Sequence, residues 1–217
     1  MTILTRIQTT LLKYITSNRA NASGDNGDEI LSKPILAFGD KIEKKESNAT
    51  RFAFQNIHGM KTTPEHSEEV QAMDELEIDI FAMSEVNLNT TDTAKKLVNT
   101  ILNQRFGRGN IAIAVQSTDK AGYHPGGTSI ITRGPAIGRI KKRIEDKMGR
   151  FTINVLEGKE GSGILCISIY RVHQTRGSKA GPNTAYSRQC DEMRLKGVQN
   201  PDPRNQILKD LTNIIQE

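Results

Sequence analysis

The sequence lacks any apolar run that approaches the roughly 18 residues required for a membrane-spanning helix. It contains two cysteines, Cys166 and Cys190, whose spacing matches neither a metal-binding motif nor a disulfide framework. We therefore expect two reduced thiols in an intracellular protein of the nucleus or cytoplasm, with no membrane association. Residues 1–24 also lack acidic side chains, a composition shared with mitochondrial transit peptides, although an incidental polar extension explains it as well.

The remaining composition describes a polar, moderately basic chain. Its 217 residues are 35% hydrophobic and include 30 basic and 25 acidic side chains, for a formal net charge of +5. This length suits one domain with a sizeable core. The positive charge modestly favours a polyanionic partner.

The first part of the chain does not resemble a packed core. Residues 1–16 carry apolar side chains at helical spacing, whereas Asn18–Asp28 is rich in asparagine, glycine, aspartate and serine. We expect residues 1–49 to be a polar, disordered extension and residues 50–217 to form the folded domain.

The domain is organised around residues 51–89, which contain two short apolar runs that each end on polar side chains. The runs are Arg51–Gly59 and Ile78–Asn87, and His66–Glu77 between them has apolar residues at helical spacing. A strand, a helix and a second strand in this order predict two parallel strands of one sheet.

Side-chain alternation draws attention to two polar residues at the ends of these strands. Asn56 falls in line with the two phenylalanines before it, and Glu85 falls in line with Phe81 and Met83. Both polar groups are therefore expected on an apolar face at the carboxyl ends of neighbouring strands, where α/β sheets commonly bind ligands. In the alternative reading, Asn56 opens a turn and Glu85 is a solvated loop acid.

The same patterns predict the other elements of the domain. Helices are expected at Thr91–Gln104, Asn183–Lys196 and from Pro203 onward, and strands at Asn110–Gln116, Thr128–Thr132, Phe151–Leu156 and Gly163–Tyr170. Asp119–Gly127 contains three glycines and a proline, which indicates a loop. His124 in this loop could touch a substrate, but we expect it to be simply exposed.

A cluster of basic residues stands in the middle of the chain. Its members are Arg139, Lys141, Lys142, Arg143, Lys147 and Arg150. The cluster could bind a nucleic-acid backbone, with each neutralised phosphate adding salt-sensitive affinity. It could equally be a solvated strand edge that lysines protect from pairing.

Several short segments carry a resemblance to a known family. Gln55–Gly59, Ser84–Asn87 and the strand end Ile167–Tyr170 resemble, in order and spacing, motifs of the endonuclease/exonuclease/phosphatase superfamily, the deoxyribonuclease-like fold. Pro125–Ile130 and Asp202–Arg204 are most similar to the endonuclease domain of non-LTR retrotransposons.

The resemblance implies an α/β fold, specifically a four-layer α/β/β/α sandwich. It also implies a phosphodiesterase that depends on Mg²⁺, with Mn²⁺ as the alternative ion. The implied substrate is DNA, with RNA as a second candidate, and no obligate protein partner is implied. The resemblance assigns Glu85 and Asn56 to the metal, and Tyr170 and Arg176 to the phosphate. Without the resemblance, Tyr170 would only cap a core.

Two later motifs of the superfamily, G-D-x-N and S-D-H, are absent from this sequence. The resemblance covers residues 51–217, about the first two thirds of such a domain, so we expect the fold to be incomplete at its C-terminus. Three functions remain open: an endonuclease domain of retroelement type, truncated here and either active or inactive, a non-catalytic nucleic-acid-binding remnant, and a phosphatase of the same fold that acts on small phosphate esters.

Overall fold

The computed structural model describes residues 44–60, 68–88, 91–116, 124–174 and 181–216, which form a mixed α/β fold with two sheets. The strands are β1 (Phe52–Asn56), β2 (Ile80–Ser84), β3 (Gly109–Ala114), β4 (Thr128–Arg133), β5 (Ile140–Glu145), β6 (Phe151–Glu157) and β7 (Gly163–Ile169). The helices are α2 (Glu68–Glu75), α3 (Thr91–Phe106), α4 (Ala185–Leu195) and α5 (Pro203–Gln216), with a 3-10 helix, η2, at Gly134–Arg139.

Sheet A has the strand order β1-β2-β4-β3, and sheet B has the order β5-β6-β7. Strands β1 and β2 pair in parallel and are separated in sequence by α2, which confirms the predicted strand–helix–strand unit. The predicted beginning of that helix, at His66, lies outside the described residues. All other strand pairs are antiparallel, including β6–β7, which correspond to the strands expected at Phe151–Leu156 and Gly163–Tyr170.

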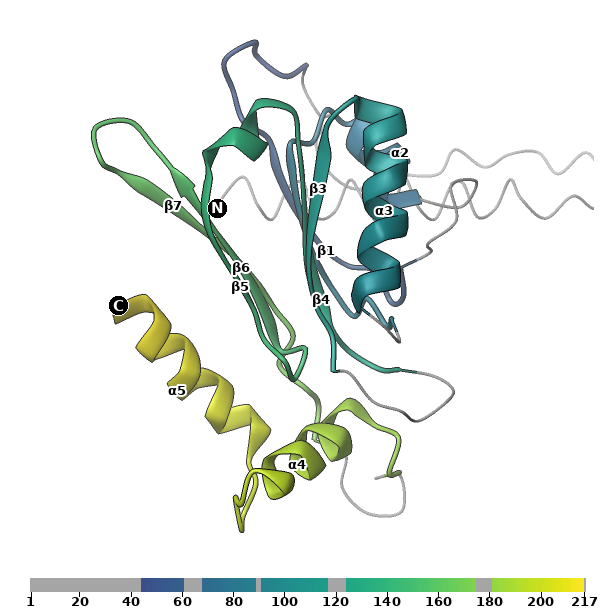
Figure 1. Ribbon diagram of the computed structural model, residues 1–217, viewed down its shortest axis with the longest axis vertical. Coiled ribbons are helices and arrows are strands. Elements are labelled where there is room, and N and C mark those ends of the chain that lie inside the picture. Colours follow the sequence, from purple (N-terminus) through teal and green to yellow (C-terminus); the bar gives the residue numbers. More distant parts are fainter. Residues whose placement is uncertain (1–43, 61–67, 89–90, 117–123, 175–180, 217) are drawn as a thin grey trace, which may run out of the picture.

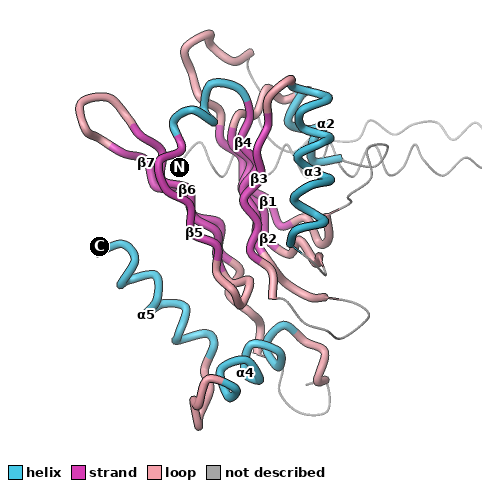
Figure 2. Tube along the Cα trace, viewed as in Figure 1, coloured by secondary structure: helices cyan, strands magenta, loops and turns pink. Residues whose placement is uncertain are grey.

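Three apolar clusters hold together the helices and sheets whose arrangement Figure 1 shows. Helices α2 and α3 cover one face of sheet A, where Met73, Phe81 and Leu102 are fully buried. The other face of sheet A packs on sheet B through a smaller cluster that includes Ile130 and Leu156. Helix α5 packs on the outer face of sheet B (Figure 2).

The interface between the sheets changes from apolar to polar toward one end. Ser84, Thr128, Thr152 and Ser168 are buried there, although all four carry hydroxyl groups. The hydroxyl groups of Thr128 and Thr152 lie 2.8 Å apart, and Ser168 Oγ donates to the carbonyl of Met83 at 2.6 Å. These hydrogen bonds link β4 to β6 and β2 to β7, so they fix the two sheets relative to each other at this end.

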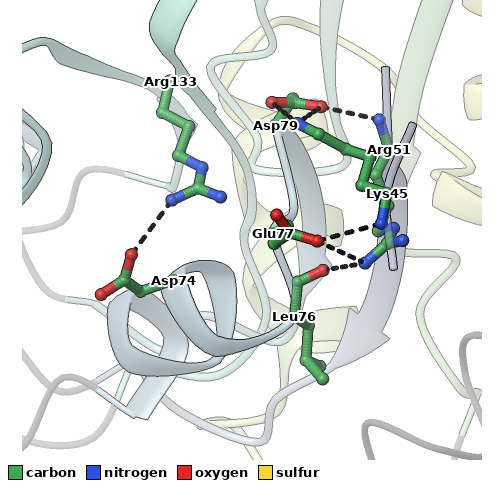
Figure 3. A network of polar contacts seen from close by, with 7 residues as sticks. All are labelled: Lys45, Arg51, Asp74, Leu76, Glu77, Asp79 and Arg133. Atoms are coloured by element: carbon green, nitrogen blue, oxygen red, sulfur yellow. Dashed lines mark hydrogen bonds and ion pairs between the residues drawn. The ribbon is translucent and has the colours of Figure 1, made fainter. Parts of the chain in front are cut away.

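A network of charged groups fixes the opposite end of β1 and β2 (Figure 3). Asp79, just before β2, accepts hydrogen bonds from Lys45 Nζ at 2.8 Å and from the backbone N–H of Arg51 at 2.7 Å. Glu77 accepts from the backbone N–H of Lys45 at 3.0 Å. Residue 45 is thus bound to the domain, on the N-terminal side of the expected boundary between residues 49 and 50.

Helix α4 begins two residues after the predicted start at Asn183, and α5 begins at the predicted Pro203. Thr184 Oγ1 caps α4 by accepting from the backbone N–H of Ser187 at 3.1 Å, and Gly197 follows the helix with a φ of +85°. Asp202 Oδ1 caps α5 by accepting from the backbone N–H groups of Arg204 and Asn205, both at 3.1 Å.

The apolar stripe of α5 is only partly buried. Ile207 and Leu211 are buried against sheet B, whereas Leu208 and Ile215 are 50% and 59% exposed. In the described part of the chain, no helix combines the length and the apolar character that crossing a membrane requires.

Candidate active site

Asn56 and Glu85 are brought together by a histidine that lies between them. Asn56 ends β1, and its Oδ1 accepts a hydrogen bond from the backbone N–H of His58 at 3.2 Å. The His58 ring then places Nδ1 3.1 Å from Glu85 Oε2. The His58 side chain is 84% exposed and that of Glu85 22% exposed, so the pair forms at the protein surface.

The route by which Glu85 reaches this position differs from the prediction. Phe52 of β1 lies beside Ile80 of β2 and shares the face toward sheet B, whereas Phe81 and Met83 face the helices. Strict alternation would therefore place Asn56 and Glu85 on opposite faces of sheet A, not on a common apolar face. Strand β2 ends at Ser84, and Glu85 adopts a left-handed backbone with a φ of +57°, which ends the alternation.

A reciprocal pair of hydrogen bonds joins the segment after Glu85 to the loop before β4. The backbone N–H of Asn87 donates to the carbonyl of Gly126 at 2.8 Å, and the backbone N–H of Gly126 donates to Asn87 Oδ1 at 2.7 Å. The backbone N–H of Met60 donates to the carbonyl of Val86 at 2.8 Å. Three loops are therefore bound together at the carboxyl ends of β1 and β2.

Tyr170 lies against the same loop. A Cβ added to Gly126 would be 3.0 Å from Tyr170 Cε1 and 3.3 Å from the Cβ of Ala185, and Gly126 has a φ of +91°. Only glycine fits without strain at this position, because both the space and the backbone conformation exclude a side chain. The close approach places the Tyr170 ring and the first turn of α4 beside the loop that carries Gly126.

His124 is buried, contrary to the expectation that it is exposed. Its exposed fraction is 6%, and its Nδ1 accepts a hydrogen bond from the guanidinium of Arg188 at 3.1 Å. Gln116 Nε2 donates to the backbone carbonyl of Arg188 at 2.9 Å. These two contacts attach α4 to the end of sheet A, so His124 positions the helix beside the candidate site.

Strained backbone is concentrated at this end of the molecule. Within the described ranges, non-glycine residues with positive φ are His58, Glu77, Glu85, Asn87 and Glu160. Three of these five belong to the loops just described. Left-handed backbone at non-glycine residues costs free energy and is enriched at functional sites.

The structure separates most of the basic cluster from Asn56 and Glu85. Lys141, Lys142 and Arg143 are exposed on β5, an edge strand, and Arg139 is exposed and donates to the carbonyl of Glu157 at 3.0 Å. Arg139 precedes β5, whose far end, Glu145, pairs with Thr152 near the candidate site. The cluster therefore begins at the opposite end of the sheets.

Arg150, predicted to contact a nucleic-acid backbone, is buried. Its side chain is 4% exposed and pairs with Asp146 Oδ2 at 2.8 Å and with Asp210 Oδ2 at 2.7 Å. Through these two ion pairs the guanidinium binds α5 to the turn between β5 and β6, and its charge is not exposed to solvent.

Two further sequence expectations concern groups around Tyr170 and the metal. Arg176, predicted to contact the phosphate, lies outside the described residues, whereas Arg171 directly follows Tyr170 and is exposed. Among the described residues, no cluster of three or more histidine, cysteine, aspartate or glutamate side chains is arranged to hold a metal ion.

Sequence reasoning missed three residues that build the site. His58 and Asn87 are part of the segments that resemble family motifs, but alternation says nothing about residues beyond a strand end. Gly126 stands in a loop whose partner, Asn87, is 39 residues away. The available signal was composition, because asparagine and glycine tolerate left-handed backbone better than other residues do.

No protein-family model and no curated protein matches this chain. Among solved structures, it is similar to the AP endonuclease LMAP from Leishmania major, with 16% identity and a TM-score of 0.44 over 67% of this chain and 47% of that one. It is also similar to an AP endonuclease from Archaeoglobus fulgidus, with 12% identity and a TM-score of 0.35 over 57% of this chain and 41% of that one. The chain thus spans less than half the length of either protein, and similarity at these scores carries no argument about family or function.

Proposed function

We propose that the surface around Asn56, Glu85 and Tyr170 is the active site of a Mg²⁺-dependent phosphodiesterase that acts on DNA, in a fold of the deoxyribonuclease-like four-layer type. The observation that carries the proposal is the convergence of the three residues from segments far apart in sequence. His58 links Asn56 to Glu85, and the reciprocal bonds of Asn87 and Gly126 lead from Glu85 to the Tyr170 ring.

Glu85 and Asn56 suit the metal that this function requires. Mg²⁺ binds oxygen ligands, accepts one or two protein carboxylates and keeps several of its waters. The carboxylate of Glu85 and the amide oxygen of Asn56 supply such ligands at a partly exposed position, where waters and a phosphate could complete the coordination. When bound, the ion would neutralise charge on the phosphodiester.

Tyr170 is proposed to bind the phosphate. Its hydroxyl can donate a hydrogen bond to a phosphate oxygen, and the contact of its ring with the Gly126 loop limits the positions the ring can take. Arg171 and Arg176, which follow it, are proposed as further phosphate contacts, since a guanidinium can form two parallel hydrogen bonds to one phosphate.

His58 is proposed as a positioning residue for Glu85. The contact between Nδ1 and Oε2 restricts the rotamer of the carboxylate, while the hydrogen bond from the His58 backbone orients the amide of Asn56. One residue therefore sets the direction of both proposed metal ligands.

The test is a nicking assay on supercoiled plasmid across a Mg²⁺ titration, with wild type, Glu85→Gln and Glu160→Gln. Glu160 is a matched control, because it is a glutamate with the same φ of +57° in the exposed turn between β6 and β7. We expect Glu85→Gln to reduce nicking by about 10²-fold or more, as loss of a group that stabilises developing charge does, and Glu160→Gln to leave it unchanged.

A second readout does not depend on activity. Mn²⁺ binding, measured by electron paramagnetic resonance, should weaken in Glu85→Gln and remain unchanged in Glu160→Gln. Equal binding by all three proteins would refute the metal assignment. Absence of nicking by the wild type at every Mg²⁺ concentration would refute the enzymatic function.

The exposed basic edge of sheet B favours a second candidate, a nucleic-acid-binding domain without catalysis. Lys141, Lys142 and Arg143 form a continuous exposed run along β5. This function predicts DNA binding that weakens steeply with salt, persists in Glu85→Ala and is accompanied by no nicking. Substituting the three basic residues by glutamine should then reduce both the affinity and the salt dependence.

A further inference from the structure

The two edges of sheet B are built differently. One edge, β5, carries the exposed residues Lys141, Lys142 and Arg143, and its register with β6 shifts between Ile140 and Lys142. Lysines and such irregularities are features by which natural proteins prevent an edge strand from pairing with another chain. The β5 edge is therefore protected.

The other edge, β7, has neither feature. From Gly161 to Tyr170 the sequence contains no charged residue, and in the described part of the chain β7 pairs with β6 alone. Three of its apolar residues are exposed to solvent, with exposed fractions of 45% for Ile164, 43% for Leu165 and 39% for Ile169. A strand that is uncharged, rich in isoleucine and open along its backbone is a template for a further strand.

Helix α5 covers only part of this strand. The apolar cluster that buries Ile207 and Leu211 of the helix includes Ile144 of β5, Ile153 of β6 and, from β7, Ile167. The hairpin of β6 and β7 reaches past α5 in Figure 2. Consequently Leu165 and Ile169, which share the outer face with Ile167, remain open on either side of the helix contact.

The charges at the two ends of β7 select the orientation of a partner strand. Glu157 and Glu160 outnumber Lys159 before β7, and Arg171 follows it. In an antiparallel pair of two identical strands, the end with Arg171 meets the acidic end of the other chain. A parallel pair would instead place like charges together.

We propose that β7 pairs antiparallel with β7 of a second copy of this chain, which joins two copies of sheet B into one six-stranded sheet. The strand is self-complementary, because its charge-free middle, centred on Cys166, opposes itself and its ends carry opposite charges. A single added strand is smaller than the standard protein interface of ~1,600 Å², so we expect a Kd of about 1–100 µM.

The experiment is sedimentation velocity of the full chain under reducing conditions, from about 1 µM to about 200 µM, a range that brackets this Kd. The double variant Leu165→Lys/Ile169→Lys introduces like charges at diagonally neighbouring positions across the pair, because Leu165 then lies diagonal to Leu165 and Ile169 of the second copy. The matched control is Leu195→Lys/Leu208→Lys, which changes two exposed leucines outside β7 that are 84% and 50% exposed. Circular dichroism verifies that each protein is folded.

We expect wild type and control to dimerise with the same Kd and the β7 variant to remain monomeric over the whole range. Amide hydrogen exchange provides a readout on the wild type alone, because backbone N–H groups of β7 should become more protected as concentration rises. A wild type that is monomeric throughout, assemblies larger than a dimer, a dimer that the β7 variant retains, or β7 exchange that is independent of concentration would each overturn the proposal.

Discussion

Replacing Arg150 by methionine is expected to destabilise the fold more than any other single change to a charged residue considered above. The guanidinium forms a bidentate contact with Asp146, at 2.8 Å and 2.9 Å, and a third contact with Asp210 at 2.7 Å. Burial lowers the pKa of Arg150, but its hydrogen bonds to the two carboxylates and their charges outweigh burial and raise the pKa overall. The guanidinium of Arg150 is therefore held in its protonated, positively charged form.

The magnitude follows from what the substitution leaves behind. Asp146 is 10% exposed, so removing its partner strands a buried negative charge, which costs about 3–5 kcal/mol of the free energy of unfolding. Asp210 is 28% exposed and can be rehydrated. Asp210→Asn should therefore cost only about 1–2 kcal/mol, the value of a hydrogen bond to a charged group in a partly solvated place.

The assay is urea unfolding followed by circular dichroism, because the sequence has no tryptophan to serve as a fluorescent probe. Arg143→Met on the exposed face of β5 is the control and should change stability by no more than about 0.5 kcal/mol. A loss below about 1 kcal/mol in Arg150→Met would refute the reasoning, since it would show that the guanidinium and Asp146 are hydrated in the folded protein.

Three further predictions concern other buried polar groups. Asp79→Ala removes the acceptor of the Arg51 backbone N–H and should lower the free energy of unfolding by about 2 kcal/mol in the same urea assay. A change near zero would contradict a structural role for the charged network around Asp79. Ser168→Ala removes the buried donor to the carbonyl of Met83 and should cost about 1–2 kcal/mol, whereas a stabilised variant would show that the hydroxyl is not paired. Burial raises the pKa of the Cys166 thiol from 9.0 to about 11, so the unfolded thiol ionises first and stability should fall as the pH rises from 9 toward 11. Iodoacetamide alkylation of Cys166 in a Cys190→Ser background should accelerate with a midpoint near about 11, and a midpoint near 9 would show that the thiol is exposed.

Local sequence patterns predicted most of the elements, because each pattern depends on a few neighbouring residues. The helices expected at Thr91–Gln104, at Asn183–Lys196 and from Pro203 onward are confirmed as α3, α4 and α5. Local patterns did not predict the order of the strands in sheet A. Strand β4 inserts between β2 and β3, an arrangement that depends on packing between residues far apart in sequence.

The candidate site was predictable only in part, for the same physical reason. Asn56 and Glu85 were identified from the strand ends, but their meeting depends on the left-handed backbone of Glu85, which alternation does not encode. His124 was expected to be exposed, because its partner Arg188 is 64 residues away and a loop sequence does not specify such a contact. Arg150 was assigned to a surface cluster because its neighbours in sequence are basic. One of the acids that pairs with it, Asp210, lies far away in sequence, on α5.

At a left-handed residue of the candidate site such as Glu85, the side chain that favours stability differs from the side chain that the proposed activity requires. Glycine adopts this backbone without steric strain, so Glu85→Gly should relieve about 1 kcal/mol of strain while it abolishes the proposed metal ligand. A population of variants selected for thermal resistance alone would accumulate glycine at residue 85, and one selected for turnover would keep the acid. A codon at which the two selections favour different residues would therefore mark the active site without any knowledge of the substrate.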